Sequence, residues 1–200
     1  MQITLHYTPS TRAVRPRWLL EELDVSYQLK THDLFAGKGN TPEYKAIHPL
    51  GYVPALEING QIQLESGAMC QWLADHFIAA GLAPTPGDPP RIKYQQWMYF
   101  TPGTLEPPAW LILMHSRILP KDQRVDSIVP WARERYLGIL EVVNDALDGR
   151  SYLVDDNFTA ADIMTGSTLM WVPDALEHFP NLQAYVERLQ QRDAFKRAAA

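Results

Sequence analysis

Three short segments in the first third of the chain carry residue types that could bind a small molecule and activate it. The first is Glu65-Ser66, which stands where a predicted strand ends and a predicted helix begins. The amides of a helix N-terminus bind carboxylates, and the Glu65 carboxylate could hold an ammonium group beside them. The pair therefore suits the two charges of an α-amino acid, although an ordinary helix cap next to a surface charge would use the same residues.

The second segment is Val53-Pro54, at the head of a predicted hairpin whose strands, 54–58 and 61–65, are joined by the turn pair Asn59-Gly60. Proline donates no backbone hydrogen bond and is confined to strand starts, edges and bulges. Pro54 therefore either starts the strand after a trans bond, or follows a cis bond that would expose the Val53 backbone to a peptide-like ligand. The residues alone favour the trans arrangement, because few X-Pro bonds are cis.

The third segment is Ser10-Thr11, between a predicted strand at 2–7 and a predicted helix at 11–23. A hydroxyl at a helix N-terminus can donate a hydrogen bond to an anion, and the helix dipole stabilises a thiolate placed there as well. A plain helix cap is the alternative. Together the three segments suit a ligand with an amino-acid end, a peptide-bond middle and a thiol, which is the chemistry of glutathione.

The elements that must position these segments divide the chain into two domains. Residues 1–80 are predicted to form a strand, a helix, a strand, an irregular stretch, two strands and a helix. Residues 81–90 are rich in proline and glycine, which is typical of a linker, and residues 91–200 show helical patterns only. We therefore expect an α/β domain followed by an all-α domain. Within the second domain, Thr159 and Asp162 have the spacing of a capping box.

Composition and charge argue against several classes of protein. The 200 residues are 46% hydrophobic and 20% charged, as in soluble globular proteins, and a net charge of −5 disfavours binding to nucleic acid or anionic membranes. No apolar run approaches the ~18 residues of a membrane span, and residues 1–10 lack the pattern of a signal peptide. The one cysteine, Cys70, cannot form an internal disulfide or a cysteine-based zinc site, which fits a reducing cytoplasm.

Four segments together resemble the soluble glutathione transferases, and the resemblance covers the full length of the chain. They are YTPSTRAVRPRWLLEEL, HPLGYVPALEI, LESGAMCQWLADHF and FTAADI. The resemblance is to the serine/threonine-type, theta-like bacterial forms. It implies a thioredoxin-like N-terminal domain, an all-helical C-terminal domain, and glutathione as co-substrate without a metal. It further implies a cytoplasmic homodimer that detoxifies small hydrophobic electrophiles by conjugation.

The resemblance also implies roles for single residues. The Val53-Pro54 bond is cis, and Val53 pairs with the cysteinyl backbone of glutathione. Glu65 and Ser66 hold the γ-glutamyl end. In the serine-type forms a serine stands before the segment that matches RAV and activates the thiol. This chain has Thr11 there, so Thr11 is the favoured activator and Ser10 the alternative.

Two departures from the family pattern modify these expectations. Related proteins often have a basic residue just before the Val-Pro pair, where this chain has Tyr52, so Lys38 is predicted to bind the glycine carboxylate of glutathione. Cysteine-type classes have a cysteine in the turn after the first strand, and this chain has none there. Reduction through a mixed protein–glutathione disulfide is therefore disfavoured, and Cys70 is expected to be a core residue.

The second substrate needs a pocket, which this family lines with its helical domain. The segment YFTPGTLEPPAWLILMH is the candidate wall, because its prolines and glycine would interrupt a helix beside Tyr99, Trp110 and Met114. These side chains suit hydrophobic ligands. A kinked helix with a normal core is the alternative.

Other functions remain open on the same fold. One is glutathione-dependent isomerisation or peroxide reduction at the same site. Another is a non-catalytic protein that resembles the transferases and binds RNA polymerase or translation-factor complexes. Such proteins often lose the Glu-Ser pair or the hydroxyl. This chain keeps both, which favours an enzyme.

Overall fold

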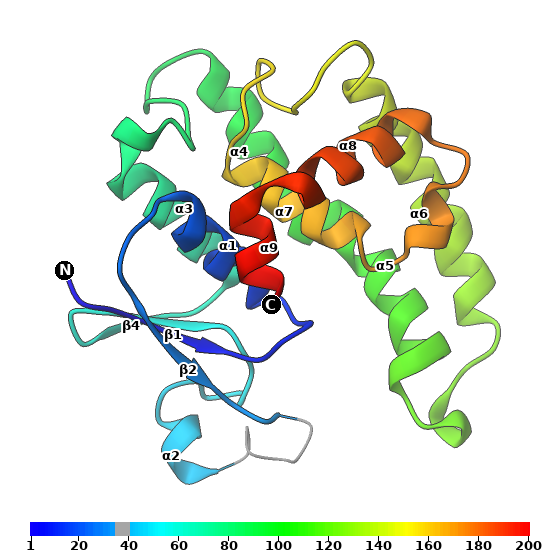
Figure 1. Cartoon of the computed structure of the whole chain (residues 1–200). Coiled ribbons are helices and arrows are strands. Elements are labelled where there is room, and N and C mark those ends of the chain that lie inside the picture. Colours follow the sequence, from blue (N-terminus) through cyan, green and yellow to red (C-terminus); the bar gives the residue numbers. More distant parts are fainter. Residues whose placement is uncertain (35–40) are drawn as a thin grey trace. The chain divides into compact units, whose positions relative to one another are not determined.

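The computed structural model describes residues 1–34 and 41–200 and divides into two units (Figure 1). Unit 1 comprises Met1–Ala83 together with Gln191–Ala200, and unit 2 comprises Pro84–Gln190. Unit 1 is an α/β structure and unit 2 is helical, so the predicted fold class is confirmed. Within the described ranges, no helix has both the length and the apolar character that crossing a membrane requires.

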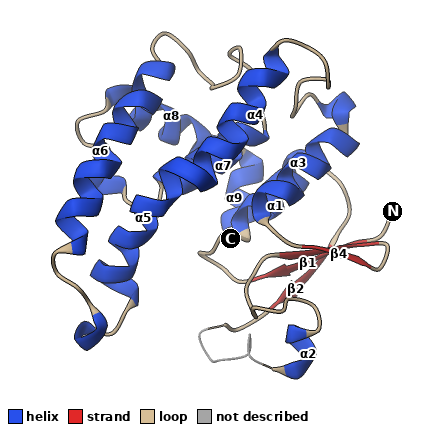
Figure 2. Ribbon diagram, turned by 180° about the vertical axis from the view of Figure 1, so that it is seen from behind, coloured by secondary structure: helices blue, strands red, loops and turns tan. Residues whose placement is uncertain are grey.

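Unit 1 is built on a four-stranded sheet with the order β2-β1-β3-β4. Strand β1 pairs in parallel with β2 and antiparallel with β3, which in turn pairs antiparallel with β4. The strands are β1 (Ile3–Tyr7), β2 (Gln28–Thr31), β3 (Ala55–Ile58) and β4 (Gln61–Gln63). The helices of this unit are α1 (Val14–Glu22), α2 (Pro42–Lys45), α3 (Ser66–His76) and α9 (Asp193–Ala199). Helices α1, α3 and α9 lie on one face of the sheet and α2 on the other, so every residue of β1 is buried (Figures 1 and 2).

Local sequence accounts for two features near the site. Asn59 and Gly60 both have positive φ, 49° and 83°, which these residue types adopt readily, and the predicted hairpin is confirmed. Helix α1 begins at Val14, three residues later than expected. Pro16 is its third residue, where an amide would have no partner within the helix, so the proline removes no helical hydrogen bond.

In unit 2, the first helix continues into the second without a break, through the proline-rich stretch formed by residues 102–108. Its helices are α4 (Pro90–Phe100), α5 (Glu106–Leu113), α6 (Ile128–Ala146), α7 (Ala160–Leu169) and α8 (Pro180–Gln191). Between α4 and α5, Thr101–Leu105 forms a π-helical turn in which the Glu106 amide donates to the Thr101 carbonyl. The predicted interruption of the helix is therefore a π-helical turn, which widens the helix locally without ending it.

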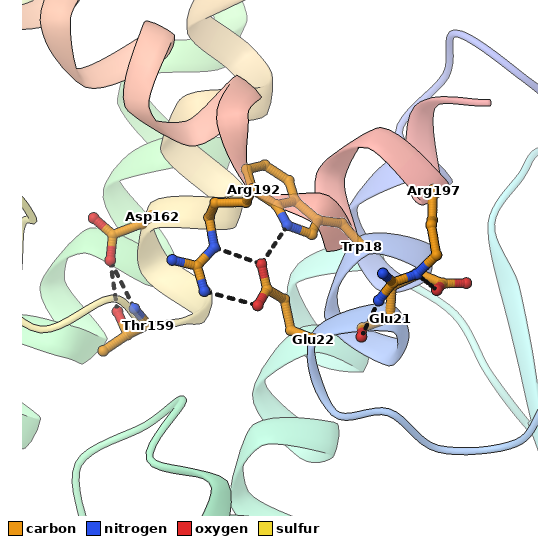
Figure 3. Close-up of polar contacts among 7 residues, drawn as sticks. All are labelled: Trp18, Glu21, Glu22, Thr159, Asp162, Arg192 and Arg197. Atoms are coloured by element: carbon orange, nitrogen blue, oxygen red, sulfur yellow. Dashed lines mark hydrogen bonds and ion pairs between the residues drawn. The ribbon is translucent and has the colours of Figure 1, made fainter.

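Helix α7 is buried along its whole length and begins with the predicted capping box. The Thr159 amide donates to Asp162 Oδ2 at 2.8 Å (Figure 3). The Ala161 amide donates to Thr159 Oγ1 at 3.3 Å. Asp162 Oδ1 accepts two further hydrogen bonds, from the Leu153 amide and the Tyr185 hydroxyl. The buried carboxylate therefore joins three segments of unit 2.

The C-terminal segment differs from the expected domain division, which assigned it to the helical domain. Residues 191–200 belong to unit 1, because α9 packs against α1. The Phe195 ring meets the Trp18 indole edge-on, with ring centroids 4.8 Å apart. Arg192 donates two hydrogen bonds, of 2.6 and 2.8 Å, to the Glu22 carboxylate, and the Trp18 indole donates a third (Figure 3).

Candidate functional site

The first candidate segment lies at the N-terminus of α3. Ser66 is the first residue of this helix and is 7% exposed, whereas the Glu65 side chain is exposed. The Glu65 backbone has a φ of 71°, which few non-glycine residues adopt. Such outliers cluster at ligand sites, where the surrounding structure holds them. The first amides of α3 have no partner within the helix, so this helix end can accept a carboxylate.

Arg15 is a candidate residue that the sequence analysis missed. It is 1% exposed, and its Nη1 donates a hydrogen bond to Ser66 Oγ at 3.2 Å. The guanidinium adds a full positive charge to the partial charge of the α3 N-terminus, which favours an anion there. The signal available in the sequence was its spacing. The apolar residues Trp18 and Leu19 follow three and four positions later, so Arg15 shares their face of the helix, which is buried.

The second candidate segment contains a cis peptide bond between Val53 and Pro54. The arrangement implied by the family resemblance is therefore confirmed, and the trans strand start is wrong. Strand β3 begins just after this pair, at Ala55, and both residues are buried. No described residue makes a hydrogen bond with the backbone amide or carbonyl of Val53, so both groups can pair with a ligand backbone.

The third candidate segment is the turn between β1 and α1, and its two hydroxyls differ in their partners. Thr11 Oγ1 donates its proton to the Thr8 carbonyl at 2.7 Å and accepts from the Ala13 amide at 3.2 Å. The Ser10 side chain is exposed and makes no hydrogen bond with the described part of the chain. Ser10 also has a positive φ of 58°. In this conformation the Ser10 hydroxyl is available to a ligand, whereas the Thr11 hydroxyl is engaged in hydrogen bonds within the turn.

Unit 2 holds the residues predicted to bind the electrophile. Tyr99 on α4 is 67% exposed, while Trp110 and Met114 are half-buried. The Trp110 ring lies 6.2 Å from that of Trp171. A hollow of about 320 Å³ opens beside the proline-rich stretch, but none of the three predicted residues lines it. Its lining comes from α5, α6 and the π-helical turn, namely Gly103, Thr104, Pro107, Pro108, Leu111, Trp131, Arg135 and Ile139.

Two further predictions concern a lysine and the cysteine. Lys38 lies outside the described residues. Cys70 is fully buried in α3, and burial raises the pKa of its thiol to about 12. The expectation of a core cysteine is confirmed by this burial. Over residues 1–34 and 41–200, no three His, Cys, Asp or Glu side chains gather as a set of metal ligands.

Both units match known protein families. Residues 1–75 match the model of the glutathione S-transferase N-terminal domain, and residues 105–193 match that of the C-terminal domain. This chain belongs to the glutathione S-transferase family. Several curated relatives carry the name of this enzyme, from yeasts, plants and a bacterium, and the protein is accordingly an enzyme of this family.

Relatives similar in sequence cover most of the transferase chain. The glutathione S-transferase-like protein LUC7 of Fusarium is 32% identical over 170 residues, which are 78% of this chain and 74% of LUC7. Glutathione S-transferase 3 of Schizosaccharomyces pombe is 29% identical over 171 residues, which are 80% of this chain and 70% of that protein.

Solved structures of other transferases share the fold over nearly the whole chain. A glutathione transferase from Methylococcus capsulatus is 27% identical, with a TM-score of 0.88 and coverage of 98% of this chain and 97% of that one. BphK, a bacterial transferase solved as a ternary complex, is also 27% identical, with a TM-score of 0.86 and the same coverage. A Phanerochaete chrysosporium transferase, solved in complex with oxidized glutathione, is 25% identical with a TM-score of 0.88, covering 98% of this chain and 94% of that one.

Proposed function

We propose that this transferase conjugates the thiolate of glutathione to small hydrophobic electrophiles. The observation that carries the proposal is the N-terminus of α3. There the unpaired helix amides, the Ser66 hydroxyl and the buried Arg15 guanidinium lie together, next to the exposed Glu65 carboxylate. The cationic helix end suits the α-carboxylate of the γ-glutamyl group, and Glu65 suits its ammonium. The complex of the Phanerochaete transferase with oxidized glutathione supports the choice of ligand class.

Val53 has the second role in this proposal. Its amide and carbonyl pair with the cysteinyl backbone of glutathione, in the manner of a short added strand. Support comes from the cis Val53-Pro54 bond and from the lack of hydrogen bonds between the Val53 backbone and the described residues. Two fixed anchors, Val53 and the α3 N-terminus, set where the thiol of the bound tripeptide lies.

A hydroxyl in the β1–α1 turn has the third role. Its donated hydrogen bond stabilises the thiolate and lowers the pKa of the thiol. The thiol therefore loses its proton to water at a pH below the ordinary cysteine pKa of about 8.5. The thiolate then attacks the electrophilic carbon, a C–S bond forms, and the leaving group departs with the electrons of its broken bond. Ser10 is the first candidate, because Thr11 must break its bond to the Thr8 carbonyl before it can donate to sulfur.

The electrophile in this proposal contacts Tyr99, Trp110 and Met114. Support comes from their size, apolar character and partial exposure on one helical path. We place the enzyme among the serine/threonine-type, theta-like bacterial forms, and we expect a cytoplasmic homodimer that detoxifies such compounds.

The test is the ultraviolet absorbance of the bound glutathione thiolate as a function of pH. Wild type is compared with Ser10→Ala, with Thr11→Ala, and with Ser26→Ala as a control that removes an exposed hydroxyl elsewhere in unit 1. We expect wild type and the control to ionise the thiol well below its free pKa, and Ser10→Ala to abolish the shift.

Turnover of a chlorodinitroarene by the same four proteins tests the reaction itself. Conjugation should fall together with the thiolate signal. Binding of glutathione without any pKa shift in wild type would overturn the transferase proposal in favour of a binding protein. A shifted thiol that reduces peroxides but does not attack the arene would assign the site to peroxide reduction.

A further inference from the structure

A polar cluster lies on the face of the sheet that α2 covers. It consists of His6 on β1, His32 just after β2, and Tyr44 on α2. His6 and Tyr44 are 1% and 3% exposed. His6 Nδ1 lies 2.8 Å from His32 Nε2, and the Tyr44 ring lies 4.2 Å from the His32 ring. Packing on both histidine rings holds the Tyr44 side chain in one orientation.

The Tyr44 hydroxyl donates a hydrogen bond to the Tyr52 carbonyl at 2.7 Å. The carbonyl of Tyr52 and the amide of Val53 belong to one planar peptide unit. A hydrogen bond that fixes the carbonyl therefore also fixes the direction of the Val53 N–H. The same bond polarises the peptide unit and makes its N–H a stronger donor.

The Tyr44 hydroxyl is suited to this role at physiological pH. Burial raises the pKa of the Tyr44 phenol to about 12, so the hydroxyl keeps its proton. The neighbouring imidazoles are neutral, because burial and nearby positive charge lower the pKa of both histidines. Two hydrogen bonds hold the backbone of His32. Its amide donates to the Tyr7 carbonyl, and its carbonyl accepts from the side-chain hydroxyl of Thr8.

We propose that Tyr44 is a positioning residue for glutathione, whose hydroxyl orients the Val53 amide toward the ligand without touching the ligand itself. The inference rests on the proposed function of Val53. It adds that the hydroxyl, and not only the aromatic ring, matters for binding. Loss of the hydroxyl should weaken glutathione binding by up to roughly 10-fold, because only part of the effect of one neutral hydrogen bond reaches the ligand.

Tyr44→Phe tests the proposal, and Tyr27→Phe is its matched control. Tyr27 is also in unit 1, and its hydroxyl donates to Glu21 Oε1 at 2.6 Å, near the C-terminal end of α1. Calorimetry gives the glutathione Kd of each variant, and steady-state kinetics give KM and kcat for both substrates. We expect Tyr44→Phe to raise the glutathione Kd and KM, while kcat at saturating glutathione and the KM for the electrophile stay at the wild-type values.

A purely structural hydroxyl would act differently. Both variants lose the hydrogen bonding of one tyrosine hydroxyl and should unfold at a lower temperature than wild type, but only Tyr44→Phe should change the glutathione Kd. A wild-type Kd in Tyr44→Phe, or an equal rise in both variants, would overturn the inference. Failure of wild type itself to bind glutathione would instead overturn the proposed function, so the two failures are distinguishable.

Discussion

Two arginine–glutamate pairs join α9 to α1 with the same geometry but different burial. In each pair the arginine Nε lies 2.6 Å from a carboxylate oxygen. The side chains of Arg192 and Glu22 are 28% and 10% exposed, whereas those of Arg197 and Glu21 are 54% and 18% exposed. If burial sets the energy of an ion pair, Arg192→Met should destabilise the protein far more than Arg197→Met.

The magnitude follows from what each substitution leaves behind. Without Arg192, the Glu22 carboxylate stays mostly buried and keeps one donor in the described part of the chain, the Trp18 indole (Figure 3). An unpaired buried charge costs about 3–5 kcal/mol, and the partial exposure of Arg192 puts the expected loss near 3 kcal/mol. For a chain of this length, that corresponds to a fall in Tm of about 6–12 °C. Exposed pairs contribute little, and Glu21 also retains the Tyr27 hydroxyl, so Arg197→Met should lower the Tm much less.

The assay is thermal unfolding followed by circular dichroism at low salt and at about 1 M salt, where charges are screened within roughly 3 Å. The effect of Arg197→Met should nearly vanish at high salt, while that of Arg192→Met should persist. A double-mutant cycle with Glu22→Gln isolates the energy of the buried pair from other contacts of Arg192. Equal losses for the two arginine variants, or a loss for Arg192→Met that salt removes, would refute the reasoning from burial.

Two more outcomes follow from packing and from protonation. A Cβ at Gly166 would overlap Leu189 Cδ1, so Gly166→Ala should cost about 1–3 kcal/mol in urea unfolding and become neutral in a Leu189→Ala background. Burial, with His32 nearby, lowers the pKa of His6 from 6.5 to about 4. At pH values between about 4 and 6.5, the unfolded chain therefore binds more protons than the folded chain. The free energy of unfolding should then fall by about 2 kcal/mol from pH 7 to pH 5. The fall should be smaller in His6→Gln, and equal pH profiles of the two proteins would contradict a buried neutral histidine.

Local signals in the sequence predicted the features that depend on residues close together in the chain. The Asn59-Gly60 turn was predictable, because these residue types adopt positive φ at little cost. The Thr159–Asp162 capping box was predictable, because its spacing matches the geometry of any helix start. Residues 81–90, rich in proline and glycine, predicted a linker, and the two units divide within this range, between Ala83 and Pro84. The cis bond before Pro54 required the family resemblance, because the two residues alone favour trans.

Partners far apart in sequence became visible only in the folded chain. Arg15 received no role in the sequence analysis, yet it lies buried against Ser66, 51 residues away. The sequence favours Thr11 as the activator, and in the fold its hydroxyl donates a hydrogen bond to the Thr8 carbonyl. The choice between Thr11 and Ser10 therefore depends on how the turn folds and not on residue type, since both side chains carry the same chemical group.

The position of the C-terminal helix α9 also depends on contacts between residues far apart in sequence. The pattern of residues 191–200 predicts a helix but cannot say which unit it joins, because helical periodicity reports only that one face is apolar. Packing of Phe195 on Trp18 and the Arg192–Glu22 pair, 170 residues apart, places the helix in unit 1. Secondary structure and capping arise from neighbouring residues and are encoded locally, whereas buried charge pairs and hydroxyl partners depend on which surfaces meet when the whole chain has folded.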